Sequence, residues 1–194
     1  LPLDAIHIPT RLRKTARARP YRIVINRDFS GLMAACATPR QPGGESWINP
    51  TLLRVYRELH ELGYAHSIEC RDRENPEGPE GLAGGLYGVS LGGAFFGESM
   101  VALRRDASKI ALIYLLEILR RCGYQLLDTQ FTTAHLQRFG VCEISRPDYQ
   151  ARLARALMAS PNPSRRFADC GHAIASEDPR TFTVMAPSAS RLSV

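Results

Sequence analysis

The chain has 194 residues and a mass of 21.5 kDa, the size of one ordinary domain or of one domain with an appendage. With 44% hydrophobic and 23% charged residues, its composition excludes a wholly disordered chain, and no apolar run is long enough to span a membrane. The formal net charge is +6, and 23 of the 25 basic residues are Arg, which favours a polyanionic partner.

Cysteine usage and the first residue bear on processing and compartment. The five Cys residues, at positions 36, 70, 122, 142 and 170, are odd in number and contain no Cys-x-x-Cys pair. We therefore expect neither a disulfide framework nor a four-cysteine zinc site, and a reducing compartment fits. Because the chain opens with Leu1 and not Met, we expect it to be processed, cut or preceded by a further segment.

In chain order, the first half predicts a short basic helix within 1–20, a strand at 21–26, a helix at about 30–37, a helix from 50 to 62 and a strand at 65–70. Asp28 is the expected N-cap of the first long helix, and Asn49 followed by Pro50 is a strong start for the second. Gly63 ends that helix.

The second half predicts strands at 84–91 and 94–100 that turn at Gly92-Gly93, a helix at 107–122 capped by Asp106, a strand at 124–130, a short helix from 132 or 133 to about 140, a strand at 141–144 and a helix at 148–158. Mixed helices and strands in this order indicate one α/β domain over 1–160. Residues 161–194, rich in Pro, Ser, Arg and Ala, are predicted to be a tail of uncertain order.

The first candidate for chemistry is Glu98, which stands in the apolar, glycine-rich segment 86–100. A buried carboxylate is costly unless it is paired, so Glu98 either has a partner or faces a site. The simpler interpretation is a carboxylate on an edge strand that faces water. Glycine within these strands indicates a bulge or a close approach of another backbone or of a ligand.

The second candidate is the pair Asp128 and Gln130, which strand alternation places on one face. A carboxylate next to an amide can polarise an attacking amine. The structural alternative is a turn at the end of the strand in which Asp128 accepts a local backbone hydrogen bond.

A third candidate is a basic run near the start of the chain, made of Arg11, Arg13, Lys14, Arg17, Arg19 and Arg22. It is either a solvated charged face or a phosphate-binding surface whose affinity falls with salt. The five His residues have no metal-binding spacing, and His66 is expected to be a core residue.

Several long segments resemble one known family. They are WINPTLLRVYRELHELGYAHSIE (47–69), GGLYGVSLGGAFFGESM (84–100), DASK (106–109), LLDTQFTTAHLQRFG (126–140) and EISRPDYQARL (143–153). In order and spacing, from about residue 3 to residue 157, they are similar to the leucyl/phenylalanyl-tRNA–protein transferases.

That resemblance implies a GNAT-like acyltransferase fold, an α+β arrangement in which helices flank a mixed, splayed sheet. It implies transfer of a leucyl or phenylalanyl group from aminoacyl-tRNA to the N-terminal Arg or Lys of an acceptor protein, which marks the acceptor for degradation. No metal or nucleotide cofactor is implied, because the ester already carries the energy. The bacterial cytoplasm is the family's location; a mitochondrion or other organelle after N-terminal processing is the alternative.

The resemblance also assigns residues. Asp128 and Gln130 match the pair that activates the acceptor amine, and Glu98 matches the carboxylate beside the aminoacyl group. Trp47 matches an aromatic residue near the 3′-terminal nucleoside, and the basic run matches the surface for the acceptor stem. The apolar wall of the aminoacyl pocket matches Leu86, Phe95, Met100, Leu112, Leu115, Leu119 and Leu127, positions that also suit plain core packing.

The chain departs from the family pattern in several places. We expect the usual N-terminal domain to be absent or to lie outside the given sequence, Thr129 replaces a Cys, and the acidic loop 71–83 is longer. An alternative hypothesis is therefore a non-catalytic member of the fold, recruited as a structural subunit of a larger assembly through that loop or the tail. A third is an acyl-CoA-dependent acyltransferase, which is disfavoured because no pyrophosphate loop opens a helix.

Overall fold

The computed structural model describes residues 3, 6–39, 44–77, 79–159 and 167–185. In chain order its elements are α1 (Thr10–Arg17), β1 (Arg22–Ile25), α2 (Phe29–Ala37), α3 (Pro50–Glu61), β2 (Ala65–Arg71), η1 (Pro79–Gly81), β3 (Leu82–Leu91), β4 (Ala94–Ala102), α4 (Ala107–Arg121), β5 (Leu126–Asp128), α5 (Ala134–Gln137), α6 (Arg146–Met158), α7 (Phe167–Ser176), η2 (Pro179–Thr181) and η3 (Thr183–Met185).

One mixed sheet of five strands organises the fold, in the order β1-β2-β3-β4-β5. The first four strands are antiparallel neighbours, whereas β5 runs parallel to β4 and pairs with it only over Ala94–Phe96. Beyond Phe96, β4 continues to Ala102 without β5 beside it. The predicted mixed α/β architecture, a sheet with flanking helices, is confirmed, and this early parting of β4 and β5 places a polar strand end next to a free strand edge.

The β3–β4 hairpin explains the glycines of this region. It turns at Gly92-Gly93 as predicted, and Gly92 adopts a positive φ of 54°. The register shifts between Tyr87 and Gly88, and a Cβ atom at Gly88 would collide with the Phe96 carbonyl oxygen and the Phe95 ring. Glycine is therefore needed at position 88 because the neighbouring strand and an aromatic side chain approach the backbone closely.

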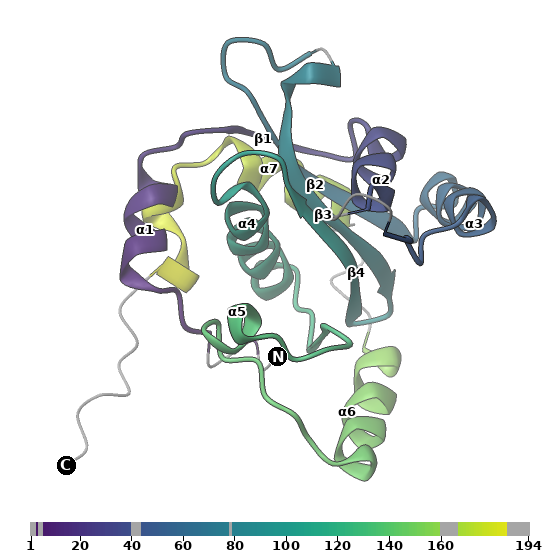
Figure 1. Ribbon diagram of the computed structural model, residues 1–194. Helices are drawn as coiled ribbons and strands as arrows, with labels where there is room; N and C mark the ends of the chain where they lie inside the picture. The colour runs from purple at the N-terminus through teal and green to yellow at the C-terminus, as the bar shows by residue number, and fades with distance from the viewer. Residues whose placement is uncertain (1–2, 4–5, 40–43, 78, 160–166, 186–194) are drawn as a thin grey trace.

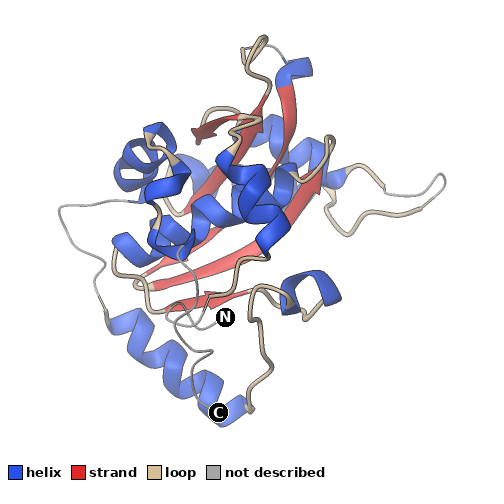
Figure 2. Cartoon of the chain, turned by 90° about the vertical axis from the view of Figure 1, so that its left-hand side faces the viewer, coloured by secondary structure: helices blue, strands red, loops and turns tan. Residues whose placement is uncertain are grey.

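The main core lies on one face of the sheet, beneath α4, α1 and α7 (Figures 1 and 2). Every residue from Ile110 to Leu119 of α4 is buried, because the sheet and neighbouring helices surround the helix. Full burial of one such aliphatic side chain contributes about 1.5–3 kcal/mol. A smaller core under α2 and α3 covers the opposite face around Phe29, Leu32 and Tyr87.

Two of the three predicted helix caps are confirmed. Asp28 accepts a hydrogen bond from the Gly31 backbone N–H at 2.9 Å, and Asn49 accepts one from the Leu52 N–H at 3.0 Å. Asp106 occupies the N-cap position of α4, as predicted, but its side chain does not cap the helix: its backbone is left-handed, with φ 58°, and its carboxylate accepts a hydrogen bond from Lys109 Nζ.

The segment after α6 belongs to the same core over its described part. Phe167 and Ile174 of α7 are buried in the main core, and Phe167 stacks on Phe95 with ring centroids 5.2 Å apart. Although the cysteine count predicted no disulfide framework, a disulfide joins Cys122 at the end of α4 to Cys170. Residues 161–166 and 186–194 of the predicted tail lie outside the described part of the chain.

Two predicted strands differ from the structure. The strand predicted at 124–130 is limited to β5, and residues 141–144 form no strand. His66 is a satisfied core residue, as predicted: it lies 3.0 Å from Asn26 Nδ2, and burial lowers its pKa to about 4. Within the described part of the chain, none of the helices combines the length and apolar character needed to cross a bilayer.

Candidate functional site

The end of β5 turns sharply, and this turn positions the first two predicted site residues. The strand stops at Asp128, and Gln130 adopts a left-handed φ of 59°, which non-glycine residues rarely do. Asp128 Oδ1 accepts a hydrogen bond from the Gln130 backbone N–H at 2.7 Å. Asp128 and Gln130 are therefore neighbours through the predicted turn chemistry and not through strand alternation.

Gln130 joins the strand end to Glu98 on β4. Its Nε2 donates to Glu98 Oε2 at 2.8 Å, across the point where β4 and β5 have parted. A carboxylate can only accept hydrogen bonds, so this contact fixes the amide orientation and leaves Gln130 Oε1 as an acceptor for a ligand. Glu98 is half-buried, and Gln130 is the hydrogen-bond partner that a carboxylate in apolar surroundings was predicted to need.

Two tyrosines hold the carboxylates from outside the sheet. Tyr149 of α6 donates its hydroxyl to Asp128 Oδ2 at 2.6 Å; burial, and then this hydrogen bond, raise the pKa of Tyr149 to about 12. Burial, and then a hydrogen bond to Glu98, raise the pKa of Tyr56 of α3 above its usual range. Each hydroxyl is therefore a protonated donor at neutral pH, and each fixes one carboxylate.

A cavity of about 480 Å³ opens beside Asp128. One wall runs from Leu126 to Thr132, and the other is formed by residues 141–144 with Arg146 and Tyr149 of α6. Phe131, on the rim, is 76% exposed and offers an aromatic face to a ligand. The cavity thus combines a fixed carboxylate, an amide acceptor and an exposed aromatic ring.

The arrangement suits the handling of an amine. Asp128 offers negative charge to an ammonium group, and Gln130 Oε1 can accept a hydrogen bond from a neutral amine. Each group is held by contacts other than the substrate, which limits the reorganisation needed when a substrate binds. No group of three or more His, Cys, Asp or Glu residues in the described ranges is arranged to hold a metal ion.

The seven predicted apolar pocket residues lie in or against the main core. Met100 is half-buried, and the other six are 4% exposed or less; they are Leu86, Phe95, Leu112, Leu115, Leu119 and Leu127. Leu127 also lines the cavity beside Asp128. The side chains of this group are thus close-packed in this structure, and Leu127 connects them with the cavity.

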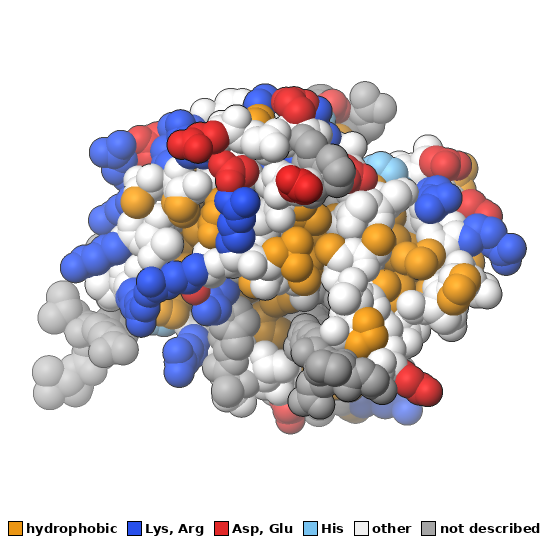
Figure 3. Space-filling model, turned by 45° about the horizontal axis from the view of Figure 1, so that its top comes forward, with side chains coloured by type: hydrophobic (Ala, Val, Ile, Leu, Met, Phe, Trp, Pro, Cys, Tyr) orange, Lys and Arg blue, Asp and Glu red, His pale blue; other side chains and the backbone are white. Residues whose placement is uncertain are grey.

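The predicted RNA-binding residues differ in their exposure. Arg11, Lys14 and Arg17 of α1 are directed to solvent, and Lys and Arg side chains gather on the side of the molecule where α1 lies (Figure 3). Arg13 is half-buried and donates from Nη2 to the Ile8 carbonyl at 3.2 Å. The remaining two are Arg19, half-buried with φ 50°, and Arg22, paired with Glu77 at 3.5 Å.

Trp47 lies in the loop before α3 and is 55% exposed, so its ring is accessible for stacking. Tyr56, Tyr149 and Phe131 are parts of the site that no sequence pattern predicted. Tyr149 stands in the segment EISRPDYQARL and Phe131 directly follows Gln130, so the motifs contained both residues. Nothing in the pattern showed which way their side chains point.

A family model and individual relatives of this chain carry the same name. A family model described as "Leucyl/phenylalanyl-tRNA protein transferase" matches residues 1–154. Proteins named leucyl/phenylalanyl-tRNA–protein transferase are similar to the chain in Maricaulis maris (strain MCS10), with 54% identity over 158 residues, in Salinibacter ruber, with 51% over 162, and in Phenylobacterium zucineum (strain HLK1), with 50% over 159. These matches cover 81%, 84% and 82% of this chain, and 70%, 67% and 69% of the respective relatives.

Proposed function

The chain belongs to the leucyl/phenylalanyl-tRNA–protein transferase family, and on that premise we propose that it moves a leucyl or phenylalanyl group from aminoacyl-tRNA to the N-terminus of an acceptor protein. It is an aminoacyltransferase, and thus an enzyme. The observation that supports this function best is the chain of contacts from Glu98 through Gln130 to Asp128, set at the edge of a cavity.

The reaction is aminolysis of an ester. The acceptor's α-amino nitrogen forms a bond to the ester carbonyl carbon, and the bond from that carbon to the terminal ribose oxygen breaks. The amine loses one proton, and the ribose oxygen gains one. Because an α-amino group has an ordinary pKa of about 7.7–8.0, much of it is already neutral near pH 7.5, and positioning supplies a large part of the acceleration.

In our proposal, Gln130 and Asp128 receive the acceptor amine. Gln130 Oε1 accepts a hydrogen bond from the amine, and so aims the nitrogen lone pair at the ester. Asp128 attracts the amine and stabilises the positive charge that develops on nitrogen as the new bond forms. Glu98 holds the Gln130 amide in the required orientation and stands beside the aminoacyl group.

The donor is proposed to bind across the cavity and the apolar core. The unbranched or γ-branched side chain of the donor is proposed to enter where Leu127 meets the cavity, and the close-packed residues behind Leu127 are proposed to move apart to form its wall. Trp47 is proposed to stack on the 3′-terminal adenine. Arg11, Lys14, Arg17 and the neighbouring basic side chains contact phosphates, so recognition rests on charge and shape.

The proposed acceptors carry N-terminal Arg or Lys. Glu143 and Asp128 line the cavity together with one cation, Arg146, so two carboxylates are offered to a cationic first side chain. The new N-terminal residue is proposed to mark the acceptor for degradation. We place the reaction in the bacterial cytoplasm, where aminoacyl-tRNA is made and used. The alternative of a non-catalytic subunit is not favoured, since the matched relatives are named as transferases.

The test is a transfer assay with the full chain. Purified protein is mixed with radiolabelled Leu-tRNA or Phe-tRNA and with acceptors that differ only in having Arg or Gly at the N-terminus. We expect label on the Arg acceptor alone. Asp128→Asn keeps the turn at Gln130 but removes the charge, and we expect it to lower kcat by roughly 10²-fold or more with tRNA affinity unchanged.

Glu61→Gln is the matched control, because it also removes one carboxylate, from the exposed end of α3. Its transfer rate should equal that of the unaltered chain. Equal loss of transfer and of tRNA affinity in Asp128→Asn would assign Asp128 to folding and contradict its proposed role.

A further inference from the structure

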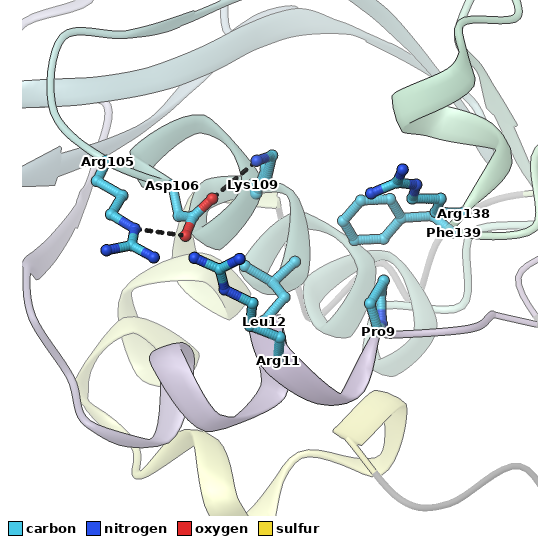
Figure 4. A pocket seen from close by; sticks show the side chains of 8 residues that line it. All are labelled: Pro9, Arg11, Leu12, Arg105, Asp106, Lys109, Arg138 and Phe139. Carbon is cyan, nitrogen blue, oxygen red and sulfur yellow. Dashed lines mark hydrogen bonds and ion pairs between the residues drawn. The ribbon is translucent and has the colours of Figure 1, made fainter.

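A second hollow, distinct from the cavity beside Asp128, lies between α1, the start of α4 and the end of α5 (Figure 4). Its volume is about 210 Å³. Four of its lining side chains are cationic and one is acidic: Arg11, Arg105, Lys109, Arg138 and Asp106. Three sections of chain that are far apart in the sequence therefore bring positive charge to one concave place.

The walls of this hollow are fixed by the core. Arg11 is followed by Leu12, which is 5% exposed, and Arg138 by Phe139, which is 1% exposed. The Phe139 carbonyl also accepts from the His7 N–H at 3.1 Å, which joins the start of the chain to the end of α5. The two Arg side chains thus project from anchored backbone, and little order is lost when they take up an anion.

The charges of the hollow are only partly neutralised. Asp106 is paired with Lys109 Nζ at 2.7 Å and with Arg105 Nε at 3.8 Å. No carboxylate of the described residues forms an ion pair with Arg11 or Arg138. The hydrogen bond from Lys109 holds the pKa of Asp106 below its usual range, so Asp106 remains a charged counter-ion at neutral pH.

Both hollows border the same short segment of chain. The cavity beside Asp128 is lined up to Thr132 and again from Val141, whereas the basic hollow is lined by Arg138 and Phe139 between them. A single nucleic-acid strand whose terminal ester lies beside Asp128 therefore has a second, positively charged hollow lined by residues of the same segment.

We propose that the hollow lined by Arg11, Arg105, Lys109 and Arg138 is a phosphate-binding site. The ligand chemistry is a phosphate group, and its source in the proposed reaction is a backbone phosphate near the 3′ end of the donor tRNA. The choice of tRNA as the molecule that carries the phosphate rests on the proposed function. The prediction that a phosphate group binds rests on the hollow alone. Planar Arg side chains and one Lys suit the oxygen atoms of a phosphate.

Two substitutions test the proposal, because one is expected to weaken the binding of Leu-tRNA and the other to strengthen it. Arg138→Ala removes an exposed cation of the hollow, and we expect weaker binding of Leu-tRNA, a raised KM for Leu-tRNA, an unchanged kcat and a salt slope smaller by about 1. Asp106→Asn removes the counter-ion and releases Lys109 and Arg105, so we expect tighter binding. Asn tolerates the left-handed backbone at this position, which makes the change conservative.

Arg155→Ala is the matched control, because it also removes one exposed positive charge, from the far end of α6. It should leave KM and the salt slope unchanged. If Arg138→Ala and Arg155→Ala change tRNA affinity equally, or if Asp106→Asn weakens binding, the tRNA phosphate is excluded from the hollow.

A second measurement, with inorganic phosphate as the probe, does not depend on the proposed function. Phosphate is titrated into the unaltered chain, and backbone amide resonances of residues 104–109 and 138–139 are followed by NMR. Shifts that are lost in Arg138→Ala support the phosphate site even if no transfer is observed. Shifts in the unaltered chain with unaltered tRNA binding in Arg138→Ala would assign the hollow to free phosphate and overturn the tRNA source. Absence of shifts, or shifts that Arg138→Ala retains, would overturn the site.

Discussion

At the scale of single residues, the site depends on which hydrogen-bonding capacities are already used. Asp128 receives the Gln130 N–H on one oxygen and the Tyr149 hydroxyl on the other, while Glu98 receives the Gln130 amide nitrogen. These contacts fix one orientation for each side chain, and the remaining acceptor, Gln130 Oε1, is the one that our proposal gives to the amine. In our proposal Tyr149 acts through its hydrogen bond to Asp128, so it is a positioning residue.

Tyr149→Phe removes the hydroxyl contact to Asp128 and keeps the ring. We expect kcat to fall about tenfold, in line with the loss of one hydrogen bond to a charged group, about 1.5 kcal/mol, with KM for the acceptor little changed. The pKa of Tyr149 is raised to about 12, so its stabilising neutral form is fully present below pH 10 and is lost only as the pH rises through 12. The rate ratio between the two proteins should therefore stay constant below about pH 10.

Steady-state kinetics over a pH series measure this ratio. Tyr64→Phe, which removes the hydroxyl of a 46% exposed tyrosine, is the control and should leave kcat unchanged. A ratio that varies with pH near neutrality would show that Tyr149 acts by ionising and not by positioning Asp128.

At the scale of elements, a buried carboxylate on α4 holds the C-terminal turns against the core. Glu117 is fully buried and accepts from the Val184 N–H at 3.1 Å, the Thr183 N–H at 3.3 Å and Arg121 Nε at 2.6 Å. Arg121 in turn contacts Glu177 at 2.8 Å. One side chain thus satisfies two backbone donors of a segment that the sequence analysis described only as a tail.

Glu117→Ala leaves Arg121 with one carboxylate fewer and two backbone N–H groups without their acceptor. We expect the free energy of unfolding to fall by roughly 3 kcal/mol, as for a broken buried pair. Urea unfolding measures this loss, and hydrogen exchange at Thr183 and Val184 shows where it arises. Glu58→Ala is the control, because its exposed carboxylate lies 3.9 Å from Arg54 and should contribute about 0.5 kcal/mol or less. Unchanged hydrogen exchange at the Thr183 and Val184 amides would contradict the proposed role of Glu117 in holding this segment.

At the scale of the whole molecule, the positive charge is not one uniform surface. The basic run contains exposed cations such as Arg17, but also Arg13, whose guanidinium donates a hydrogen bond to the backbone before α1. Arg13 Nε is buried and has no hydrogen-bond partner among the described residues. Counting charges along the sequence therefore overestimates the number of residues that can meet a phosphate.

Arg17→Ala and Arg13→Ala should separate these two uses of Arg. For Arg17→Ala we expect the plot of log affinity for Leu-tRNA against log salt to become shallower by about 1, with an unchanged melting temperature. For Arg13→Ala we expect an unchanged slope and a lower melting temperature, because the hydrogen bond to Ile8 is lost. Binding titrations by fluorescence anisotropy at several salt concentrations measure both slopes. Identical slopes for the two variants would contradict this division.

By itself the sequence determined the elements whose signals are local. The caps at Asp28 and Asn49, the turn at Gly92-Gly93 and the helix predicted at 107–122 each depend on residues within a few positions of one another, and the structure confirms them. The long motifs also identified the family and, with it, the candidate site residues.

Only the tertiary structure decided how these parts meet. Strand alternation could not show that Gln130 leaves the strand and reaches Glu98, because that contact spans two strands and a left-handed residue. Segments that are distant in sequence are likewise joined by the hydrogen bond from Tyr149 to Asp128, by the hydrogen bonds of Glu117 to the C-terminal turns, and by the basic hollow. Local propensity describes short-range backbone preferences, whereas these features follow from packing, burial and charge across the whole chain.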